Sequence, residues 1–537
     1  MGGGESKKLF HGDRIAGDDC MATPQSSQSS FIKNVAVDCS LGSDAFKLRS
    51  FHYTESLGQP FKGVLELQSD NADIDFAQLL GKPMTVSITL PDGGQRYYSG
   101  LARCIRQTGD AGNTALYRAE IVPWITCLEL GSDCRIFQNK SAIDILHQIF
   151  EDLGFSDYDV SGVIGNYSPL EFCAQYNETH SNFVHRLMQR FGIYYFHKHV
   201  AGRHTLALCD SHTSHKSFPG YATIPYKCAK GTAYSWEHIF LWSASEQMRS
   251  GKFTLKDYAP SSPKADLVAS HTSSHSYPHG DLERFEYPGG YAKQDDGDTL
   301  ATVRIEQSEC RGKEFFGEAF CFGLSVGSTF SLEDHPRNDQ NASYLTESVD
   351  FSIEVSKLEA APAYSYRSGF KAIPASVQFR PERSAPTPRI AGVQTAVVVA
   401  PVGQDSSVPY TDPSASATVQ FHWDRAGSKD ERSSCWLRCS QPSAGSGWGS
   451  IFLPLVGNEV IVAFEDGHPD RPIIVGNVYN ADNKPPRSLP DDSLKTIVKD
   501  VAGNFIVLDS KEGAESVTIL TAYKTNFWMI GDSREPD

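Results

Sequence analysis

The sequence lacks long hydrophobic runs, and it also lacks runs of basic residues. No window approaches the ~18 apolar residues that a membrane-spanning helix needs, so no such helix is predicted. Lys and Arg never occur in runs longer than two, and the formal net charge is −16. Because this charge repels phosphate backbones and anionic lipid surfaces, nucleic acid is not an expected partner.

Cysteine is sparse for the length of the chain. The 12 cysteines form no C-x-x-C pair, which argues against a disulfide scaffold and favours free thiols in a reducing compartment. Residues 1–20 contain no apolar core of the kind that a secretory signal needs. We therefore expect the chain to be made and folded in the cytoplasm, and any export to proceed without an N-terminal signal.

Glycine, proline and aromatic residues are abundant and predict a mainly β protein. The 537 residues include 44 Gly, 29 Pro, 30 Phe and 22 Tyr, which indicates short strands, many turns and aromatic cores. This length predicts three or four domains. The usual catalytic motifs are missing, since there is no G-x-S-x-G elbow, no H-E-x-x-H and no phosphate loop.

Two helices with strong apolar stripes follow a strand-rich region over residues 31–130. The first, SAIDILHQIFEDLG, has a predicted capping box of Ser141 and Asp144 and ends at Gly154. The second, NETHSNFVHRLMQRFG, ends at Gly192, and the next residues, IYYF, predict a strand.

The middle of the chain has weaker patterns. Residues 211–290 are rich in Ser, His, Tyr and Pro, so we expect long loops, followed by a weaker helix over residues 299–306. Residues 371–389 contain four prolines and have the composition of a linker.

Short β runs recur from residue 390 onward. Six of them predict a small closed barrel over residues 390–481: QTAVVVAP, ATVQFHW, SCWLRCSQP, GSIFLP, EVIVAF and PIIVGNVY. KTIVKDV, NFIVLDS, SVTIL and NFWMI then follow at a spacing of roughly 8–12 residues. These pieces are too thin to bury a core alone, so they must find partners in the same domain or in other chains.

Regularly spaced histidines are candidates for a functional site. His271, His275 and His279 lie four residues apart and on a helix could bind zinc together, but SHTSSHSYPHG is a poor helix, so a solvated loop is favoured. His197 and His199 have strand spacing and point the same way. An exposed polar strand face is the favoured interpretation for this pair.

An ordered stretch from residue 445 to 476, GSGWGSIFLPLVGNEVIVAFEDGHPDRPIIVG, contains no pair of residues poised for chemistry. Its glycines are interpreted as turn residues beside the bulky Trp448. Glu465, Asp466 and Asp470 could serve glycoside hydrolysis as paired carboxylates. Because DG and HP are turn dipeptides and Arg471 is close in sequence, a charged hairpin turn is favoured.

The barrel region contains two further candidate pairs. Phe421 and Trp423 alternate on a predicted strand, so they could contribute to a core or stack on the bases of a single nucleic-acid strand. Nine acidic and five basic residues over 390–481 argue against the second role. Cys435 and Cys439 are expected to pack inward as small hydrophobes. No catalytic, cofactor-binding or metal-binding residue is predicted.

Long stretches of this sequence resemble one family. VQFHWDRAG and SSCWLRCSQPSAGSGWGSIFLPLVGNEVIVAFEDGHPDRPIIVGNVYN are similar to the central barrel of VgrG, the spike protein of bacterial type VI secretion systems, which is related to contractile-phage tail hub and tail spike proteins. FHYTESLGQPFKGVLEL, CAQYNETHSNFVHRLMQRFGIYYF and PRIAGVQTAVVVAP stand upstream in the order that the family shows. The resemblance covers roughly residues 31–520.

The resemblance implies a fold that is mainly β with α insertions. A phage tail-hub-like module of two barrel-like β domains with helices would be followed by an oligonucleotide/oligosaccharide-binding (OB) barrel and by the start of a trimeric triple-stranded β-helix. The predicted boundaries are 1–30 for a disordered extension or a misassigned start, 31–375 for the hub module, 376–389 for the linker, 390–481 for the OB barrel and 482–537 for the needle start.

The resemblance also implies a function without an active site or cofactor. Three chains would cap the Hcp tube, puncture the target envelope in a transient passage through its membrane, and carry a PAAR-type tip and effectors or adaptors, in contact with baseplate components. The alternative is a phage-type tail spike with cell-wall hydrolase activity, although NADNKPPRSLPDDS leaves no room for a catalytic domain. Because NFWMIGDSREPD does not visibly continue the needle repeats, a short needle and a truncated chain both stay open.

Overall fold

The computed structural model describes residues 32–90, 92–112, 114–227, 237–355, 363–523 and 526–531. By packing, the chain divides into two units. Unit 1 comprises residues 1–126, 157–165 and 192–381, and unit 2 comprises residues 127–156, 166–191 and 382–537. The predicted extension over residues 1–30 lies outside the described residues, and the other domain boundaries stay a prediction.

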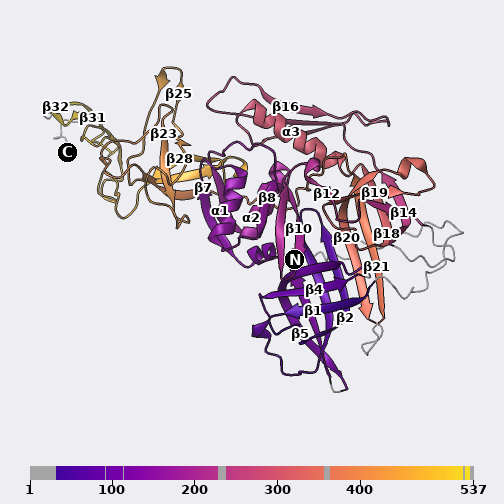
Figure 1. Cartoon of the computed structure of the whole chain (residues 1–537). Helices are drawn as coiled ribbons and strands as arrows, with labels where there is room; N and C mark the ends of the chain where they lie inside the picture. Colours follow the sequence, from indigo (N-terminus) through magenta and orange to yellow (C-terminus); the bar gives the residue numbers. More distant parts are fainter. Residues whose placement is uncertain are drawn as a thin grey trace. The chain divides into compact units, whose positions relative to one another are not determined.

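One large sheet organises unit 1 (Figure 1). Its main path runs β1-β4-β5-β6-β3-β2-β20-β21-β18-β14, so the pairing of β2 with β20 joins an N-terminal group of strands to a later one. The short strands β12 and β13 pair with β19, which pairs with β20. The bounds are β1 Asn34–Cys39, β2 Lys47–Ser56, β3 Gln59–Ser69, β4 Pro83–Thr89, β5 Gln95–Ala111, β6 Thr114–Val122, β12 Lys216–Ser217, β13 Thr223–Pro225, β14 His238–Glu246, β18 Lys313–Phe320, β19 Ser328–Glu333, β20 Ser343–Val355 and β21 Tyr364–Pro374.

Alternation of side chains gives this sheet its aromatic core. Along β3, Phe61, Leu65 and Leu67 are buried while the residues between them are more exposed, as period-2 strands require. Phe51 and Tyr53 on β2 have no exposed surface. The strands predicted over residues 31–130 are therefore confirmed.

Two smaller sheets complete unit 1. One has the order β10-β11-β8, with β8 Tyr158–Gly162, β10 Tyr194–Val200 and β11 Arg203–Cys209. The other has the order β16-β15-β17, with β15 Lys252–Asp257, β16 Leu267–Thr272 and β17 Glu283–Glu286. Helix α3, Gln294–Glu309, lies along this second sheet (Figure 1). The prediction of long loops over residues 211–290 is therefore wrong in part, and the third helix is longer than predicted at both ends.

A buried polar cluster joins β10 and β11 to the large sheet. Glu55 on β2 is 5% exposed, and its carboxylate accepts hydrogen bonds from the Tyr53 hydroxyl at 2.9 Å and from the His197 backbone N–H at 3.0 Å. Nδ1 of His197 lies 2.8 Å from the same carboxylate. His199 hydrogen-bonds the Tyr53 hydroxyl at 3.0 Å, and His204 accepts the Trp124 N–H at 2.9 Å.

The predicted exposed polar face at His197 and His199 is thus wrong. The two side chains do point the same way, but toward the large sheet, and His197 is only 3% exposed. Their rings and that of His204 surround Phe61, with centroids 4.8, 5.0 and 5.5 Å from its ring. Burial lowers the pKa of each of these histidines to about 3.

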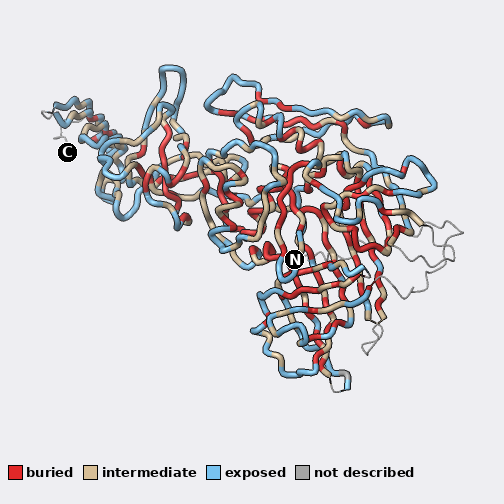
Figure 2. Tube along the Cα trace, in the orientation of Figure 1, coloured by how far each residue is buried: buried red, intermediate tan, exposed pale blue. Residues whose placement is uncertain are grey.

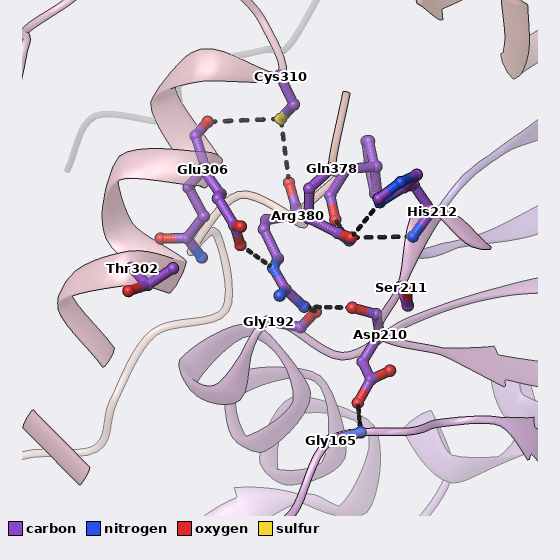
Figure 3. Close-up of polar contacts among 12 residues, drawn as sticks. Gly165, Gly192, Asp210, Ser211, His212, Thr302, Glu306, Cys310, Gln378 and Arg380 are labelled. Carbon is purple, nitrogen blue, oxygen red and sulfur yellow. Dashed lines mark hydrogen bonds and ion pairs between the residues drawn. The ribbon is translucent and has the colours of Figure 1, made fainter. Parts of the chain in front are cut away.

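Arg380 fixes the first part of the proline-rich segment to unit 1 (Figure 3). Its Nε donates to Glu306 on α3 at 2.7 Å, and a terminal nitrogen donates to the carbonyls of Gly192 and Asp210 at 2.9 and 2.7 Å. The neighbouring Phe379 is 2% exposed. The segment contains no helix or strand after β21, but these contacts show that it is not a loose tether at this end.

Helices and a barrel form the base of unit 2. Helix α1, Ala142–Asp152, has the predicted capping box of Ser141 and Asp144, and Gly154 follows with a φ of +79°. Helix α2, His180–Phe191, begins three residues later than predicted, because the residues before it belong to β9. Strands β7, Ser132–Phe137, and β9, Cys173–Thr179, pair with each other.

The barrel itself has the strand order β24-β23-β22-β27-β28. A parallel bridge between Cys439 and Ile474, with a hydrogen bond of 2.8 Å from Ser440 N–H to the Ile474 carbonyl, joins the two ends of this order. Val398, Val419, Phe421, Leu437, Val460 and Val462 fill its interior. The bounds are β22 Gln394–Val399, β23 Ser416–Phe421, β24 Leu437–Arg438, β27 Glu459–Phe464 and β28 Pro472–Val478, with a separate hairpin of β25 Ala444–Gly445 and β26 Trp448–Gly449.

The histidine cluster predicts that unit 1 loses stability in acid. His204 has an ordinary pKa of about 6.5 when unfolded, so its contribution is complete above that value and is lost as the pH falls toward about 3. We expect His204→Gln, which keeps an acceptor for Trp124, to reduce the loss between about pH 7 and pH 5 by about 2 kcal/mol. Hydrogen exchange of the β10 and β11 amides measures this opening free energy.

His52→Gln is the matched control, because this histidine of the same unit has a side chain that is 51% exposed. Burial raises the pKa of Glu55, so the contribution of this carboxyl to the stability of unit 1 changes with pH in the opposite direction. Glu55 is present in both variants. Equal acid sensitivity in His204→Gln and the native chain would contradict the assignment.

Candidate functional site

The end of the described chain is an antiparallel sheet with the order β29-β30-β31-β32. The bounds are β29 Lys495–Lys499, β30 Phe505–Asp509, β31 Ser516–Thr521 and β32 Asn526–Gly531. All four predicted β pieces are therefore strands, and each finds a partner within the same chain. Strand β32 is the fourth strand of this sheet, although its sequence did not visibly continue the needle repeats.

One face of this tail sheet is almost entirely apolar. The register places Val498, Ile506, Ile519 and Trp528 in one row across the strands, and Leu508, Val517 and Ile530 beside Thr496 in the next. The seven apolar side chains are each between 37% and 60% exposed. On the opposite face Val507 and Thr518 are buried, although Phe527 is 52% exposed, so the face of the seven apolar side chains is the more open of the two. Figure 2 shows most of the tail strands as exposed or intermediate.

A β hairpin of small residues extends from the barrel (Figure 1). A Cβ on Gly445 would lie 2.3 Å from the Trp448 indole, and Gly447 occupies the turn with a φ of +76°. These glycines are turn residues beside Trp448, as predicted. The predicted strand GSIFLP is wrong, because Ile451 and Phe452 lie outside the barrel sheet and are 67% and 54% exposed.

A buried ion pair secures the helices of unit 2 to the barrel. Nε of Arg186 lies 3.0 Å from both carboxylate oxygens of Glu178, and the two side chains are 8% and 5% exposed. Arg186 also donates to the Ala174 carbonyl at 2.8 Å, while the Ala174 N–H donates to Asp470 of the barrel at 2.7 Å. Ala174 therefore connects strand β9 both to Arg186 of α2 and to Asp470 of the barrel.

Two of the three candidate carboxylates have structural partners, and the third lies in a turn. Glu465 pairs with Arg438 rather than facing a second acid, and Asp466 occupies a turn with a φ of +53°. Asp470 accepts the buried hydrogen bond from β9. Glu465 and Asp470 are thus engaged in structural contacts.

The spaced histidines do not converge on one point either. His271 lies on β16, whereas Nε2 of His275 pairs with Glu309 at 3.0 Å and its ring stacks on Tyr277. His279 has a φ of +65° in the following turn. The solvated-loop interpretation is thus wrong for His271, which is part of a strand, and for His275, whose side chain is 11% exposed.

The barrel aromatics are used inside the protein. Phe421 is 1% exposed, and Trp423 stacks on it with ring centroids 4.9 Å apart. Trp423 also meets Tyr176 at 5.5 Å and donates to Gln394 at 2.8 Å, so stacking on nucleic-acid bases is not supported. Cys435 and Cys439 pack against the barrel core as predicted, and burial raises the pKa of Cys435 to about 12.

The described residues contain neither a cluster of metal ligands nor a membrane-spanning helix. Among the residues placed by the structure, no set of three or more His, Cys, Asp or Glu side chains could hold a metal ion. Within the same described ranges, no helix combines the length and the apolar character needed to cross a membrane.

Sequence reasoning missed the most distinctive surface, the open apolar face of the tail sheet. The signal was present in the alternation of KTIV, FIVL and SVTIL, which placed strands but not their shared register. It also missed Glu55, because its partner His197 is 142 residues away in the chain.

Comparison with known families agrees with this architecture. A family model described as the phage tail baseplate hub matches residues 54–356. A second, described as the type VI secretion system/phage-baseplate injector OB domain, matches residues 396–479, which include the barrel strands from β23 to β28.

Solved structures share the fold at low sequence identity. The Escherichia coli c3393 protein, a type VI secretion component described as similar to the T4 tail proteins gp27 and gp5, matches with a TM-score of 0.56 and 18% identity over 81% of this chain and 97% of its own. The lidded Francisella PdpA-VgrG complex matches with a TM-score of 0.61 and 10% identity over 94% of this chain and 80% of that chain.

Curated relatives are more similar in sequence. VgrG1a of Pseudomonas aeruginosa is 38% identical over 497 residues, which cover 90% of this chain and 76% of the relative. VgrG1b of the same organism is 37% identical over 496 residues, and the match spans 90% of this chain but just under two thirds, 66%, of that relative. Both are type VI secretion system spike proteins, and the chain described here belongs to their family, VgrG.

Proposed function

We propose that this chain forms a homotrimeric spike of a type VI secretion system, with the tail sheet as the start of a triple-stranded β-helix. The observation that carries the proposal is the open apolar face of β29–β32. Monomeric soluble proteins rarely expose contiguous apolar patches larger than a few hundred Å². A face lined by seven apolar side chains therefore requires a covering partner.

Two further copies of the same chain are the simplest partners that could cover this apolar face. Three identical sheets arranged around one axis can each turn the apolar face inward, so that the three faces form a single core. The long side chains Ile506, Ile519 and Trp528 lie in one row across the strands, and a threefold arrangement would bring three such rows together. Full burial of such a side chain contributes about 1.5–3 kcal/mol relative to full exposure, and these three have 39–60% of that exposure left to lose.

The same geometry suits passage through an envelope. In apolar surroundings every unpaired backbone N–H or C=O costs several kcal/mol. The four tail strands already pair with one another, which leaves β29 and β32 as the edges of each copy. We expect contacts between copies to protect these edges, so that the assembled spike offers few unsatisfied groups to lipid during a transient passage.

The partners follow from this role. The hub end would sit on the Hcp tube and on baseplate components, and the narrow end would carry a PAAR-type tip and, with it or directly, effector proteins or adaptors. The Francisella VgrG has been solved in a complex with PdpA, which supports a carrier role for the family fold. The spike would be cytoplasmic before firing and would leave with the contracting machine rather than through a signal peptide.

The function proposed here is mechanical and not enzymatic. Glu465 and Asp470 of the barrel turn have structural partners, Asp466 lies in the turn itself, and the aromatic pair of the barrel packs in its core. Neither cell-wall hydrolysis nor nucleic-acid binding is therefore expected of the described residues.

A charge placed in the apolar face should prevent assembly. The native chain is expected as a trimer of 177 kDa, which is three copies of 59.0 kDa. In Ile519→Asp, each copy loses the burial of one isoleucine and brings a carboxylate close to the threefold axis. We expect light scattering of this variant to give the monomer mass of 59.0 kDa.

Ser510→Asp provides the matched control, because it adds the same charge in an exposed turn between β30 and β31. This variant should remain a trimer. A native monomer, or a trimer of Ile519→Asp, would count against the proposed role of the apolar face.

The absence of hydrolase activity can be tested separately. Purified protein should release no fragments from peptidoglycan, and Glu465→Gln should behave like the native chain. This substitution removes only a half-exposed ion pair with Arg438, so its effect on stability should be below about 1 kcal/mol. Clearing of cell walls by the native chain that Glu465→Gln abolishes would instead support the phage-type enzyme.

A further inference from the structure

Unit 1 contains a cavity of about 530 Å³ that the spike function does not use. Strands β2, β5, β8 and β10 line it together with residues 213–219 and 324–328. This volume lies within the range of 300–1,000 Å³ that is typical of small-molecule sites. Its walls combine apolar groups such as Leu208 and Val326 with a few charged side chains, which is the usual composition of a ligand pocket.

Arg96 on β5 is the unusual member of this lining. The residue is only 8% exposed, and its guanidinium lies 3.8 Å from the centroid of the Phe218 ring and 5.7 Å from that of Tyr98. Its Nε is buried and has no hydrogen-bond partner in the described chain. Tyr98 is its polar neighbour, and in the described chain no acidic side chain forms an ion pair with Arg96.

The acidic residues of the lining are committed elsewhere. Asp159 pairs with Lys198 at 2.8 Å, and hydrogen bonding to that ammonium holds the pKa of Asp159 at about 2. Glu55 already accepts hydrogen bonds from Tyr53 and His197, and burial raises its pKa, which favours the neutral form.

Two positive charges of the lining form no ion pair within the described ranges. Arg96 interacts electrostatically with the carboxyls of Glu55 and Glu237, but burial raises the pKa of both, which favours their neutral forms. Lys216 on β12 is exposed at the cavity and forms no ion pair within the described ranges, and Arg96 lies deeper. A buried cation without an anion costs several kcal/mol, which is why such groups are normally paired. The planar guanidinium fork, stacked on an aromatic ring, matches the oxygens of a carboxylate or a phosphate.

We propose that this cavity binds a small organic anion, with one carboxylate or phosphate group on Arg96 and an apolar or aromatic body against Phe218 and the apolar wall. Lys216 attracts the anion at the entrance. All of the lining belongs to unit 1 of a single chain.

The test is calorimetric titration of the full chain with phenyl phosphate and, separately, with benzoate, at constant ionic strength set by chloride. Binding of one molecule per chain is expected. Arg96→Lys keeps the charge but loses the fork, and it should weaken binding about tenfold or more. Lys216→Gln should weaken binding about two- to fivefold through loss of an exposed charge.

Lys82→Gln is the matched control, because this lysine is exposed in unit 1 and lies outside the cavity lining. It should bind like the native chain. Lys216→Gln keeps the test valid even if Arg96→Lys fails to fold, since Lys216 is exposed. The proposal is overturned if neither probe binds, or if the affinity of Lys216→Gln equals that of the native chain.

Discussion

An apolar sheet face that its own chain leaves open is the constraint on which the architecture of unit 2 depends. Four strands cannot bury both of their faces, and here the chain covers the side that contains Val507 and Thr518. The other side keeps a row of large side chains in water, which would be unfavourable in an isolated monomer. The sequence of the tail is therefore fitted to an assembly rather than to the single chain. Self-pairing of the strands sets the register, and it is the register that makes the apolar side chains one surface.

The proposed needle can transmit force only if its base resists deformation. The base is a barrel whose strand order is joined at its ends by the Cys439–Ile474 bridge and which has an apolar interior. The helices are held to it by paired groups, because Ala174 of β9 hydrogen-bonds Arg186 on one side and Asp470 on the other. Removal of either partner of the buried Arg186–Glu178 pair would leave a buried charge without a counterion. The pair therefore contributes more to specifying one docking geometry than to net stability. Tyr176 and Trp423 extend the same contact with aromatic packing.

Sequence reasoning succeeded for features that neighbouring residues determine and failed for features that distant residues determine. The capping box at Ser141, the glycine after α1 and the alternating tail strands are local, so a few neighbouring residues determine them. The fold as a whole was accessible only through the family resemblance. Failures occurred where a distant residue decides: His197 has a strand pattern that suits solvent, yet Glu55 from another strand accepts its backbone N–H and lies 2.8 Å from its Nδ1. In the ordered stretch after Trp448, hydrophobic residues predicted a strand at Ile451 and Phe452, but they lie outside the barrel sheet and exposed. No local pattern separates a core strand from an apolar surface segment, because only the assembled structure shows which side is covered.

Three arginines show how the molecule separates structure from binding. Arg186 and Arg380 are each surrounded by acceptors: a carboxylate and one backbone carbonyl for the first, a carboxylate and two carbonyls for the second (Figure 3). The fold places acceptors around these guanidinium groups, and the resulting hydrogen bonds and ion pairs offset the free-energy cost of removing the groups from water. Arg96 differs, since aromatic rings flank its guanidinium, no carboxylate forms an ion pair with it, and its Nε has no acceptor in the described chain. Because this group also borders a cavity, an anion from solution can complete its hydrogen bonding, as the proposed site requires.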